Sequence, residues 1–349
     1  MGNPPLTFRL GSPDRLNTPR GRFGCGSGMK ASPIVDVHAH VTPRRFREAV
    51  QSGRDWHGMT AEDGELDNPK NLWGPERRIE EMDALGVDVQ LVSPTDCFYQ
   101  YDKDPGVTAA IAKECNDEIA EMTRAYPRRF MGLGTLPMQD AELTLAEMER
   151  GMRLGLRGFM IDDHVNGRTY DDPFFEPFWA AAERHRAFLL VHQGGPTTIT
   201  TRTKSYFLPN TVGNLVDRTL TFGCLVFGGV MDRHPGLVVC LGHAGGYVPY
   251  AVDRMDRGWD AFPKYRGKAR DRPSTYLGRF LYDAATFTDR NLRFLIDAVG
   301  VENVVLGTDW PAPMEVEDPV RRIKESMILA DAEREAILRG NIARVLKRP

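Results

Sequence analysis

Val35-Asp-Val-His-Ala-His40 is a short apolar run that carries one acid and two histidines. It has the pattern of a buried β-strand, in which side chains two residues apart lie on the same face. Asp36, His38 and His40 therefore share a face, and the two histidines lie about 7 Å apart along the strand because each residue adds roughly 3.3 Å. Two imidazoles at this spacing can converge on one cation. The motif alone leaves a second interpretation open, a pair of core histidines with ordinary hydrogen-bond partners.

Similar apolar runs recur along the chain, and segments with helical spacing separate them. The runs are Ile34–Val37, Val87–Val92, Phe130–Leu136, Gly158–Ile161, Phe188–Val191, Leu237–Leu241, Phe280–Tyr282 and Val304–Leu306. The helical segments include Glu76–Leu85, Val107–Ala125, Leu143–Leu154, Phe174–His185, Leu215–Asp232 and Asn291–Val299. Continuous apolar strands between helices are typical of a parallel sheet covered on both faces. Eight of them predict an α/β fold, a (β/α)8 TIM barrel.

Two segments depart from this alternation. Residues 41–73 are polar and contain glycine, and they lie between the first strand and its helix, so we expect a small inserted lobe near the barrel mouth. Residues 1–28 are rich in Gly, Pro and Arg, without periodic apolar positions or the apolar core of a signal peptide, which predicts either a disordered extension or a mis-assigned start of translation. Residues 29–349 would then form the barrel with its lobe.

Composition excludes several classes of partner. The 349 residues include 45 basic and 48 acidic side chains, for a net charge of −3, so no overall field favours nucleic acid or an anionic membrane. No apolar run approaches the roughly 18 residues that a membrane span needs. The five cysteines are scattered without a CxxC pair, which argues against a disulfide framework and favours a cytoplasmic protein.

Three further polar residues lie within three positions of the end of an apolar run. His192 follows the fifth run, His243 stands two residues beyond the sixth and Asp309 three residues beyond the eighth. In a closed barrel these positions lie on the rim at the carboxyl ends of the strands, where active sites of this fold are built. Together with the two histidines of the first strand they form a mixed imidazole and carboxylate set, suited to Zn²⁺ or a similar transition metal.

Other residues and motifs give weaker indications of function. His164 follows the fourth run and lies close enough to the rim to line a pocket without binding metal. The sequence has no Walker or GxGxxG pattern and no GxSxG elbow, so neither a nucleotide cofactor nor a serine nucleophile is indicated.

Four longer stretches of the sequence resemble those of a known protein family. They are Trp73–Asp83, Tyr126–Met138, His234-Pro-Gly-Leu-Val-Val-Cys-Leu-Gly-His-Ala-Gly-Gly246 and Gly307-Thr-Asp-Trp-Pro-Ala-Pro313. With the motif of the first strand they resemble the amidohydrolase superfamily, and within it the decarboxylase branch typified by 2-amino-3-carboxymuconate-6-semialdehyde decarboxylase. The resemblance spans nearly all of residues 33–345.

The resemblance implies a role for each matching residue. The residues that would hold one Zn²⁺, with Mn²⁺ or another divalent transition metal as the alternative, are His38, His40, His192 and Asp309. His243 would act as acid and base beside the metal, and Asp309 is a second possible proton carrier. Arg254 would bind a substrate carboxylate.

The chain departs from the family pattern around the predicted pocket. His192 is followed by Gln193-Gly-Gly-Pro196, where the family usually has Pro-Trp-Asp. The family's Leu-Pro-Trp element stands here as Leu208-Pro-Asn210. Gln193 and Asn210 are therefore predicted, with His164, to line the substrate site. These changes affect the substrate and leave the chemistry intact.

Arg254 needs a second subunit if it is to reach substrate. It lies about nine residues along a helix expected to begin near Gly245 or Gly246, roughly 13 Å below the rim at 1.5 Å per residue. From spacing alone it is a surface arginine in a charged, solvated face. The resemblance instead implies a homodimer in which Arg254 enters the partner's pocket.

The resemblance implies a metal-dependent, non-oxidative decarboxylase, a carbon–carbon lyase of aromatic catabolism. Its substrate would be a small hydroxy- or amino-substituted aromatic, heteroaromatic or muconate-like carboxylate. The alternative is a hydrolase or hydratase that uses the same metal-bound hydroxide on a lactone, amide or enol acid. A catalytically inactive barrel that serves in binding or assembly is a third possibility, against which the intact set of ligands argues.

Overall fold

The computed structural model describes residues 32–64 and 66–346. The extension predicted for residues 1–28 lies outside the described residues. None of the described helices is long and apolar enough to cross a membrane.

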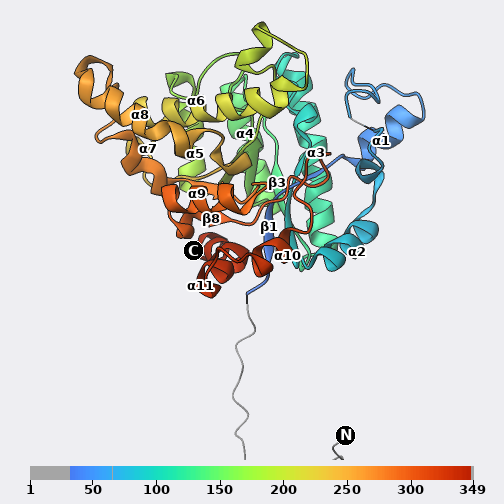
Figure 1. The fold of residues 1–349 in the computed structure, drawn as a ribbon. Helices are drawn as coiled ribbons and strands as arrows, with labels where there is room; N and C mark the ends of the chain where they lie inside the picture. The colour runs from blue at the N-terminus through green and yellow to red at the C-terminus, as the bar shows by residue number, and fades with distance from the viewer. Residues whose placement is uncertain (1–31, 65, 347–349) are drawn as a thin grey trace, which may run out of the picture. The chain divides into compact units, whose positions relative to one another are not determined.

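Eight parallel strands form one sheet in the order β1 to β8 (Figure 1). The strands are β1 (Val35–Val41), β2 (Val89–Pro94), β3 (Phe130–Gly134), β4 (Gly158–Ile161), β5 (Phe188–Val191), β6 (Val238–Leu241), β7 (Leu281–Asp283) and β8 (Val304–Val305). Backbone hydrogen bonds also join β1 to the chain that continues β8: Val37 N donates to Leu306 O, and Asp309 N to His38 O, both at 2.9 Å. The α/β class and the eight parallel strands are as predicted, and the curled sheet is consistent with a TIM barrel.

Helices connect the strands. They are α1 (Arg44–Gln51), α2 (Pro75–Leu85), α3 (Pro105–Ala125), α4 (Ala141–Leu154), α5 (Glu176–His185), α6 (Asn214–Phe227), α7 (Val230–Arg233), α8 (Val248–Ala261), α9 (Asp289–Val299), α10 (Pro319–Glu325), α11 (Asp331–Glu335) and α12 (Asn341–Leu346). The prediction of a single helix over Leu215–Asp232 is wrong, because this segment forms two helices, α6 and α7, with an interruption at Gly228 and Gly229. Gly229 has φ of 71°, a left-handed conformation that glycine adopts without steric cost and that ends a helix.

The strands position the site because their apolar side chains are buried. Strands β4 and β5 consist entirely of buried residues, as the continuous apolar runs predicted. The polar residue that follows each strand is therefore held at the carboxyl edge of the sheet.

The segment of residues 41–73 contains α1 and a short 3-10 helix, Pro69–Leu72. Its side chains Phe46, Trp56 and Met59 form a small hydrophobic cluster with Phe98 and with residues of α3. The segment therefore packs against α3 through this cluster.

Candidate metal centre

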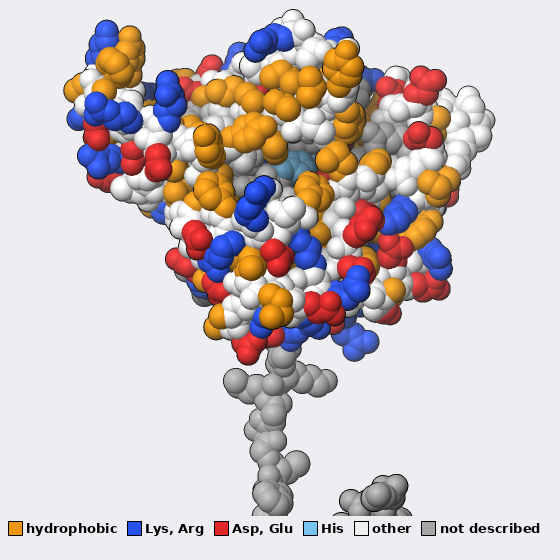
Figure 2. Space-filling model, in the orientation of Figure 1, with side chains coloured by type: hydrophobic (Ala, Val, Ile, Leu, Met, Phe, Trp, Pro, Cys, Tyr) orange, Lys and Arg blue, Asp and Glu red, His pale blue; other side chains and the backbone are white. Residues whose placement is uncertain are grey.

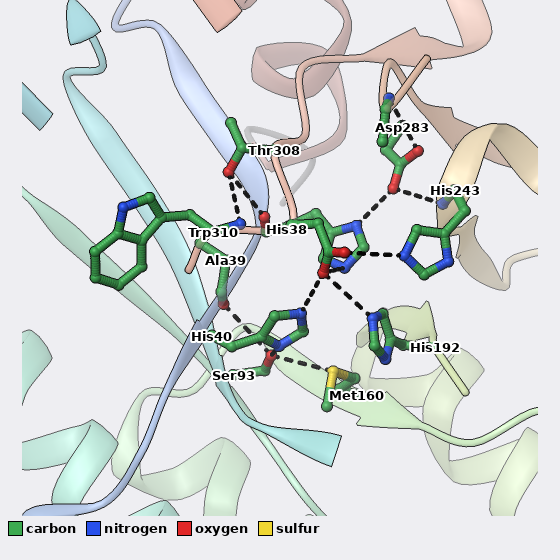
Figure 3. Close-up of polar contacts among 12 residues, drawn as sticks. His38, Ala39, His40, Ser93, Met160, His192, His243, Asp283, Thr308 and Trp310 are labelled. Atoms are coloured by element: carbon green, nitrogen blue, oxygen red, sulfur yellow. Dashed lines mark hydrogen bonds and ion pairs between the residues drawn. The ribbon is translucent and has the colours of Figure 1, made fainter. Parts of the chain in front are cut away.

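Three imidazoles converge on one carboxylate oxygen. The Nε2 atoms of His38, His40 and His192 lie 3.2, 3.1 and 3.5 Å from Oδ1 of Asp309 (Figure 3). The two histidines of β1 point the same way because they stand two residues apart, and His192 directly follows β5. The side chains of the three histidines are at most 5% exposed.

His243 joins the cluster from a different direction. Its Nε2 lies 3.3 Å from Oδ2 of Asp309, the other carboxylate oxygen, and its side chain is 18% exposed. The ligand atoms of His38, His192, His243 and Asp309 all lie within 4.8 Å of one another, and this group includes His243 but not the predicted ligand His40. His243 differs from the other three imidazoles in the carboxylate oxygen that it faces and in its greater exposure.

Asp283, at the end of β7, is hydrogen-bonded both to the His38 imidazole and to the backbone of His243. Its Oδ2 accepts hydrogen bonds from His38 Nδ1 at 2.6 Å and His243 N at 2.9 Å, and its Oδ1 accepts one from Ala244 N at 2.7 Å. His243 and Ala244 have φ of 54° and 56°, a left-handed conformation that active sites maintain through such contacts. Sequence reasoning missed Asp283, although it directly follows the apolar run Phe280–Tyr282.

The Nδ1 atoms of the other two buried imidazoles are also occupied. His192 Nδ1 donates to Gln193 O at 2.9 Å, and His40 Nδ1 lies 3.0 Å from Ser93 Oγ. With Nδ1 held by a neighbour, Nε2 is left to face the centre of the cluster. Metal-binding histidines are oriented in this way.

The charges of the cluster suit a cation. Burial by itself would raise the pKa of Asp309, but the positive charge of His38 and the close imidazoles of His192 and His243 hold that pKa well below its usual value. Burial lowers the pKa of His192 far below its usual value and also lowers that of His40. Near pH 7 the cluster therefore offers an ionised carboxylate, that of Asp309, and two neutral imidazoles, those of His40 and His192, which are the forms that bind metal.

Two buried nitrogens in the cluster need a partner. The Nε2 atoms of His38 and His192 are buried and make no hydrogen bond of acceptable geometry, although both face Asp309. Burial lowers the pKa of His38, but the carboxylates of Asp309 and Asp283 outweigh it and raise that pKa to about 10. A proton or a cation is thus required between these atoms, and the donor set fits a divalent transition metal.

Asp36 fixes the register of the strands beneath the cluster. Its Oδ1 accepts hydrogen bonds from the backbone N–H groups of His38 and Thr308, both at 3.1 Å. Its Oδ2 accepts from Thr308 Oγ1 at 2.8 Å and from Gln90 Nε2 at 3.1 Å. Burial raises the pKa of Asp36 to about 6 despite these bonds. Sequence reasoning placed Asp36 on the correct face without finding this role.

A cavity of about 740 Å³ opens beside the cluster. His243 and Asp309 line it together with a mainly apolar wall that includes Phe207, Tyr247, Pro249, Tyr250, Ala285, Phe287, Phe294, Leu295 and Met314. Figure 2 shows histidine in a hollow with hydrophobic side chains around it. We refer to this space as the metal cavity.

The other predicted site residues are divided between different places. Asn210 lines the metal cavity, and Gln193 lines an adjoining groove of about 490 Å³. His164 lines a separate cavity of about 750 Å³, where its Nε2 lies 3.1 Å from Pro196 O. Arg254 is exposed on α8, which begins at Val248, two residues beyond Gly246, and it is absent from the lining of its own metal cavity. The structure therefore brings only Asn210 of these four into the metal cavity.

A family model described as amidohydrolase matches residues 35–348. The chain belongs to the amidohydrolase family. The match covers every strand and the five residues of the cluster, in agreement with the resemblance that the sequence motifs indicate.

Named relatives specify the branch. The chain is 31% identical over 326 residues to a 2-amino-3-carboxymuconate-6-semialdehyde decarboxylase of Dictyostelium discoideum, with 88% of this chain and 89% of that protein covered. It is 28% identical over 288 residues to a gamma-resorcylate decarboxylase of a Rhizobium species, with 77% and 86% covered. Among solved structures it resembles 5-carboxyvanillate decarboxylase from Sphingomonas paucimobilis, with a TM-score of 0.79, 26% identity and coverage of 91% and 100%.

These relationships confirm the predicted enzyme class. The chain is a carboxy-lyase, a decarboxylase of the amidohydrolase superfamily similar to 2-amino-3-carboxymuconate-6-semialdehyde decarboxylase. They favour this reaction over the hydrolase or hydratase that the sequence left open as an alternative.

Proposed function

We propose that this decarboxylase acts on a small hydroxy- or amino-substituted aromatic, heteroaromatic or muconate-like carboxylate in the catabolism of aromatic compounds. The observation that carries the proposal is the convergence of three Nε2 atoms on one point at the edge of an apolar cavity of about 740 Å³. An apolar wall with aromatic side chains suits a flat ring. The substrates in the names of the relatives, a muconate semialdehyde and a resorcylate, belong to the same chemical class.

We propose His38, His40, His192 and Asp309 as the ligands of one divalent metal. The three imidazoles that share one carboxylate oxygen support this set over one that contains His243. A site of three nitrogens and one carboxylate suits Zn²⁺, which we propose as the resident ion, with Mn²⁺ as the alternative. When bound, such an ion supplies positive charge that withdraws electrons from the substrate's oxygen atoms.

We propose that His243 donates the proton that replaces the lost carboxylate. In decarboxylation the bond between the ring carbon and the carboxylate carbon breaks, CO2 leaves, and the electron pair that remains on the ring carbon takes up one proton. His243 lines the cavity, and histidine is a side chain that commonly accepts and donates protons in catalysis. Asp309 Oδ2, at 3.3 Å from its Nε2, is the second possible carrier.

Release of CO2 from a panel of carboxylates tests the reaction and the substrate class together. We expect the metal-loaded enzyme to decarboxylate at least one compound among hydroxybenzoates, hydroxypicolinates and 2-amino-3-carboxymuconate-6-semialdehyde. CO2 trapping with product identification measures this. If the loaded enzyme released CO2 from none of them but opened lactones or amides, the hydrolase alternative would replace the proposal.

We further propose that the enzyme is a homodimer in which Arg254 binds the substrate carboxylate in the partner's cavity. No Lys or Arg is among the described residues that line the metal cavity, although its proposed substrate is an anion. The cavity mouth carries exposed aromatic side chains, with Tyr250 80%, Phe287 61% and Phe207 60% exposed, which is typical of a surface that a protein partner covers. Arginine binds carboxylates through two parallel hydrogen bonds.

Mixed dimers test this arrangement. Arg254→Ala and His243→Ala homodimers should each be nearly inactive, because each removes a different component from every site. Heterodimers of the two variants should regain up to one working site of the two, since one cavity then has both wild-type residues. Activity of purified heterodimers measures this, and full activity of the Arg254→Ala homodimer or no recovery in the heterodimer would reject it.

Two finer predictions also remain proposals. Residues 41–73 would form a small lobe at the barrel mouth, supported by their own hydrophobic cluster. A cytoplasmic location is supported by the scattered cysteines, of which Cys115, Cys224 and Cys240 are free thiols.

A further inference from the structure

Two asparagines stand where the metal cavity meets the adjoining groove. Asn210 and Asn214 line both spaces, and Phe207 is the third residue that they share. The asparagines are four residues apart at the junction of a π-helical turn, Pro209–Gly213, with α6, so their side chains lie on the same face. Such π-helical turns are frequent at functional sites.

Close packing holds this turn in place. A Cβ atom on Gly213 would approach Thr197 Oγ1 to 2.2 Å, so only glycine permits this contact with the loop that follows β5. The turn is thus seated against the loop that also carries His192, a proposed metal ligand. The position of the two amides is therefore tied to the position of the metal cluster.

The Asn214 side chain faces the cavity and makes no hydrogen bond with another described side chain. The residue as a whole is only 6% exposed, but its amide atoms are not among the fully buried ones, so they are open to the cavity that Asn214 lines. Polar groups in such a position hydrogen-bond to the water or the ligand that fills the cavity. Since Asn214 lines the metal cavity, a molecule bound there is placed to satisfy it.

The charges around the pair select a neutral partner. None of the described residues that line the metal cavity is Lys or Arg, and Asp309 adds a negative charge. Lys204 lines the groove, but it is exposed and does not line the cavity. In the proposed dimer the partner's Arg254 is engaged by the carboxylate that is lost, so a second anionic group on the substrate would lose water here without gaining a cation of its own, which is costly. A hydroxyl both donates and accepts hydrogen bonds, as the amide of asparagine does.

We propose that Asn210 and Asn214 form a subsite for a hydroxyl group on the substrate ring, remote from the carboxylate that is lost. The inference rests on the proposed function because it takes the metal cavity as the substrate site. It narrows the substrate class to carboxylates that carry such a hydroxyl and excludes dicarboxylates whose second carboxylate would occupy this position.

Binding of inert product analogues tests the subsite without turnover. The probes are the three dihydroxybenzenes, the three methylphenols and the three hydroxybenzenesulfonates, titrated calorimetrically into the metal-loaded enzyme. We expect at least one dihydroxybenzene to bind roughly tenfold more tightly than the methylphenol and the sulfonate with the same ring positions, the effect of about one good hydrogen bond. Equal affinity for the three substituents, or tighter binding of the sulfonate, would overturn the proposal.

Substitutions test whether the preference for a hydroxyl group arises from Asn210 and Asn214. Asn214→Leu keeps the size of the side chain and removes its hydrogen bonds, so the preference for hydroxyl over methyl should fall to within about twofold, with Asn210→Leu giving a smaller loss. Asn291→Leu is the matched control, because Asn291 lines the same cavity at an exposed position where water competes. The control should keep the preference, and metal content and thermal unfolding should show that each variant is folded.

The outcomes separate this inference from the proposed function. Release of CO2 from the carboxylate panel without a hydroxyl preference in binding would reject the subsite and leave the decarboxylase assignment standing. A hydroxyl preference that Asn214→Leu retains would also reject it. A preference that Asn214→Leu abolishes supports the subsite even if none of the tested carboxylates is turned over.

Discussion

Asp309→Asn and His38→Ala are each expected to abolish turnover and to lower the amount of bound metal. Each change removes one of four proposed protein ligands, and a metal held by three has an open, weaker site. Asn in place of Asp309 also removes the negative charge on which three Nε2 atoms converge at 3.1 to 3.5 Å. Metal per protein chain after dialysis, measured by mass spectrometry, checks the result alongside the rate of CO2 release.

A charge-matched control separates the ligand from the loss of a negative charge. Asp331→Asn changes the same functional group at a side chain that is 98% exposed on α11, and it should keep both metal and activity. If the purified wild-type protein held no metal, and chelators left its turnover unchanged, the assignment of the metal centre would be wrong.

His243→Ala is expected to keep metal near the wild-type level while turnover falls by about 10²- to 10⁴-fold, the usual range for a lost acid or base. The structure gives the reason for this separation: His243 faces Oδ2 of Asp309, whereas the proposed ligands face Oδ1. Metal content and single-turnover rates should be measured on the same preparation.

His185→Ala is the matched control for this experiment. His185 is paired with Glu149 at the end of α5, away from the metal cavity, so its loss should leave turnover unchanged. If His243→Ala lost its metal together with its activity, His243 would be a ligand, as the 4.8 Å grouping of its nitrogen with His38, His192 and Asp309 permits.

The strands could be predicted from the sequence because their signal is local. A buried strand of a parallel sheet is an uninterrupted apolar run, and all eight predicted runs contain or overlap an observed strand. The break between α6 and α7 was missed because Gly228 and Gly229 stand within an otherwise periodic apolar pattern.

The candidate ligands could be found for the same reason. His192, His243 and Asp309 each stand close behind an apolar run, and parallel strands end at one edge of the sheet. Asp283 likewise follows the apolar run Phe280–Tyr282 and is the last residue of β7, but an aspartate at a strand end does not by itself indicate which side chain it will bind.

By itself the sequence determined the α/β class with eight parallel strands, the family and the polar residues at the strand ends, since these depend on residue type and short-range spacing. Only the tertiary structure decided how those residues are used. The contact of His38 with Asp283 joins residues 245 positions apart, and it leaves Nε2 of His38 free to face the centre. His164 and Asn214 are a second example. His164 was predicted to line the substrate site but lines a different cavity, whereas Asn214 was not predicted and lines the metal cavity. Such directions depend on contacts between distant segments, which residue spacing along the chain does not contain.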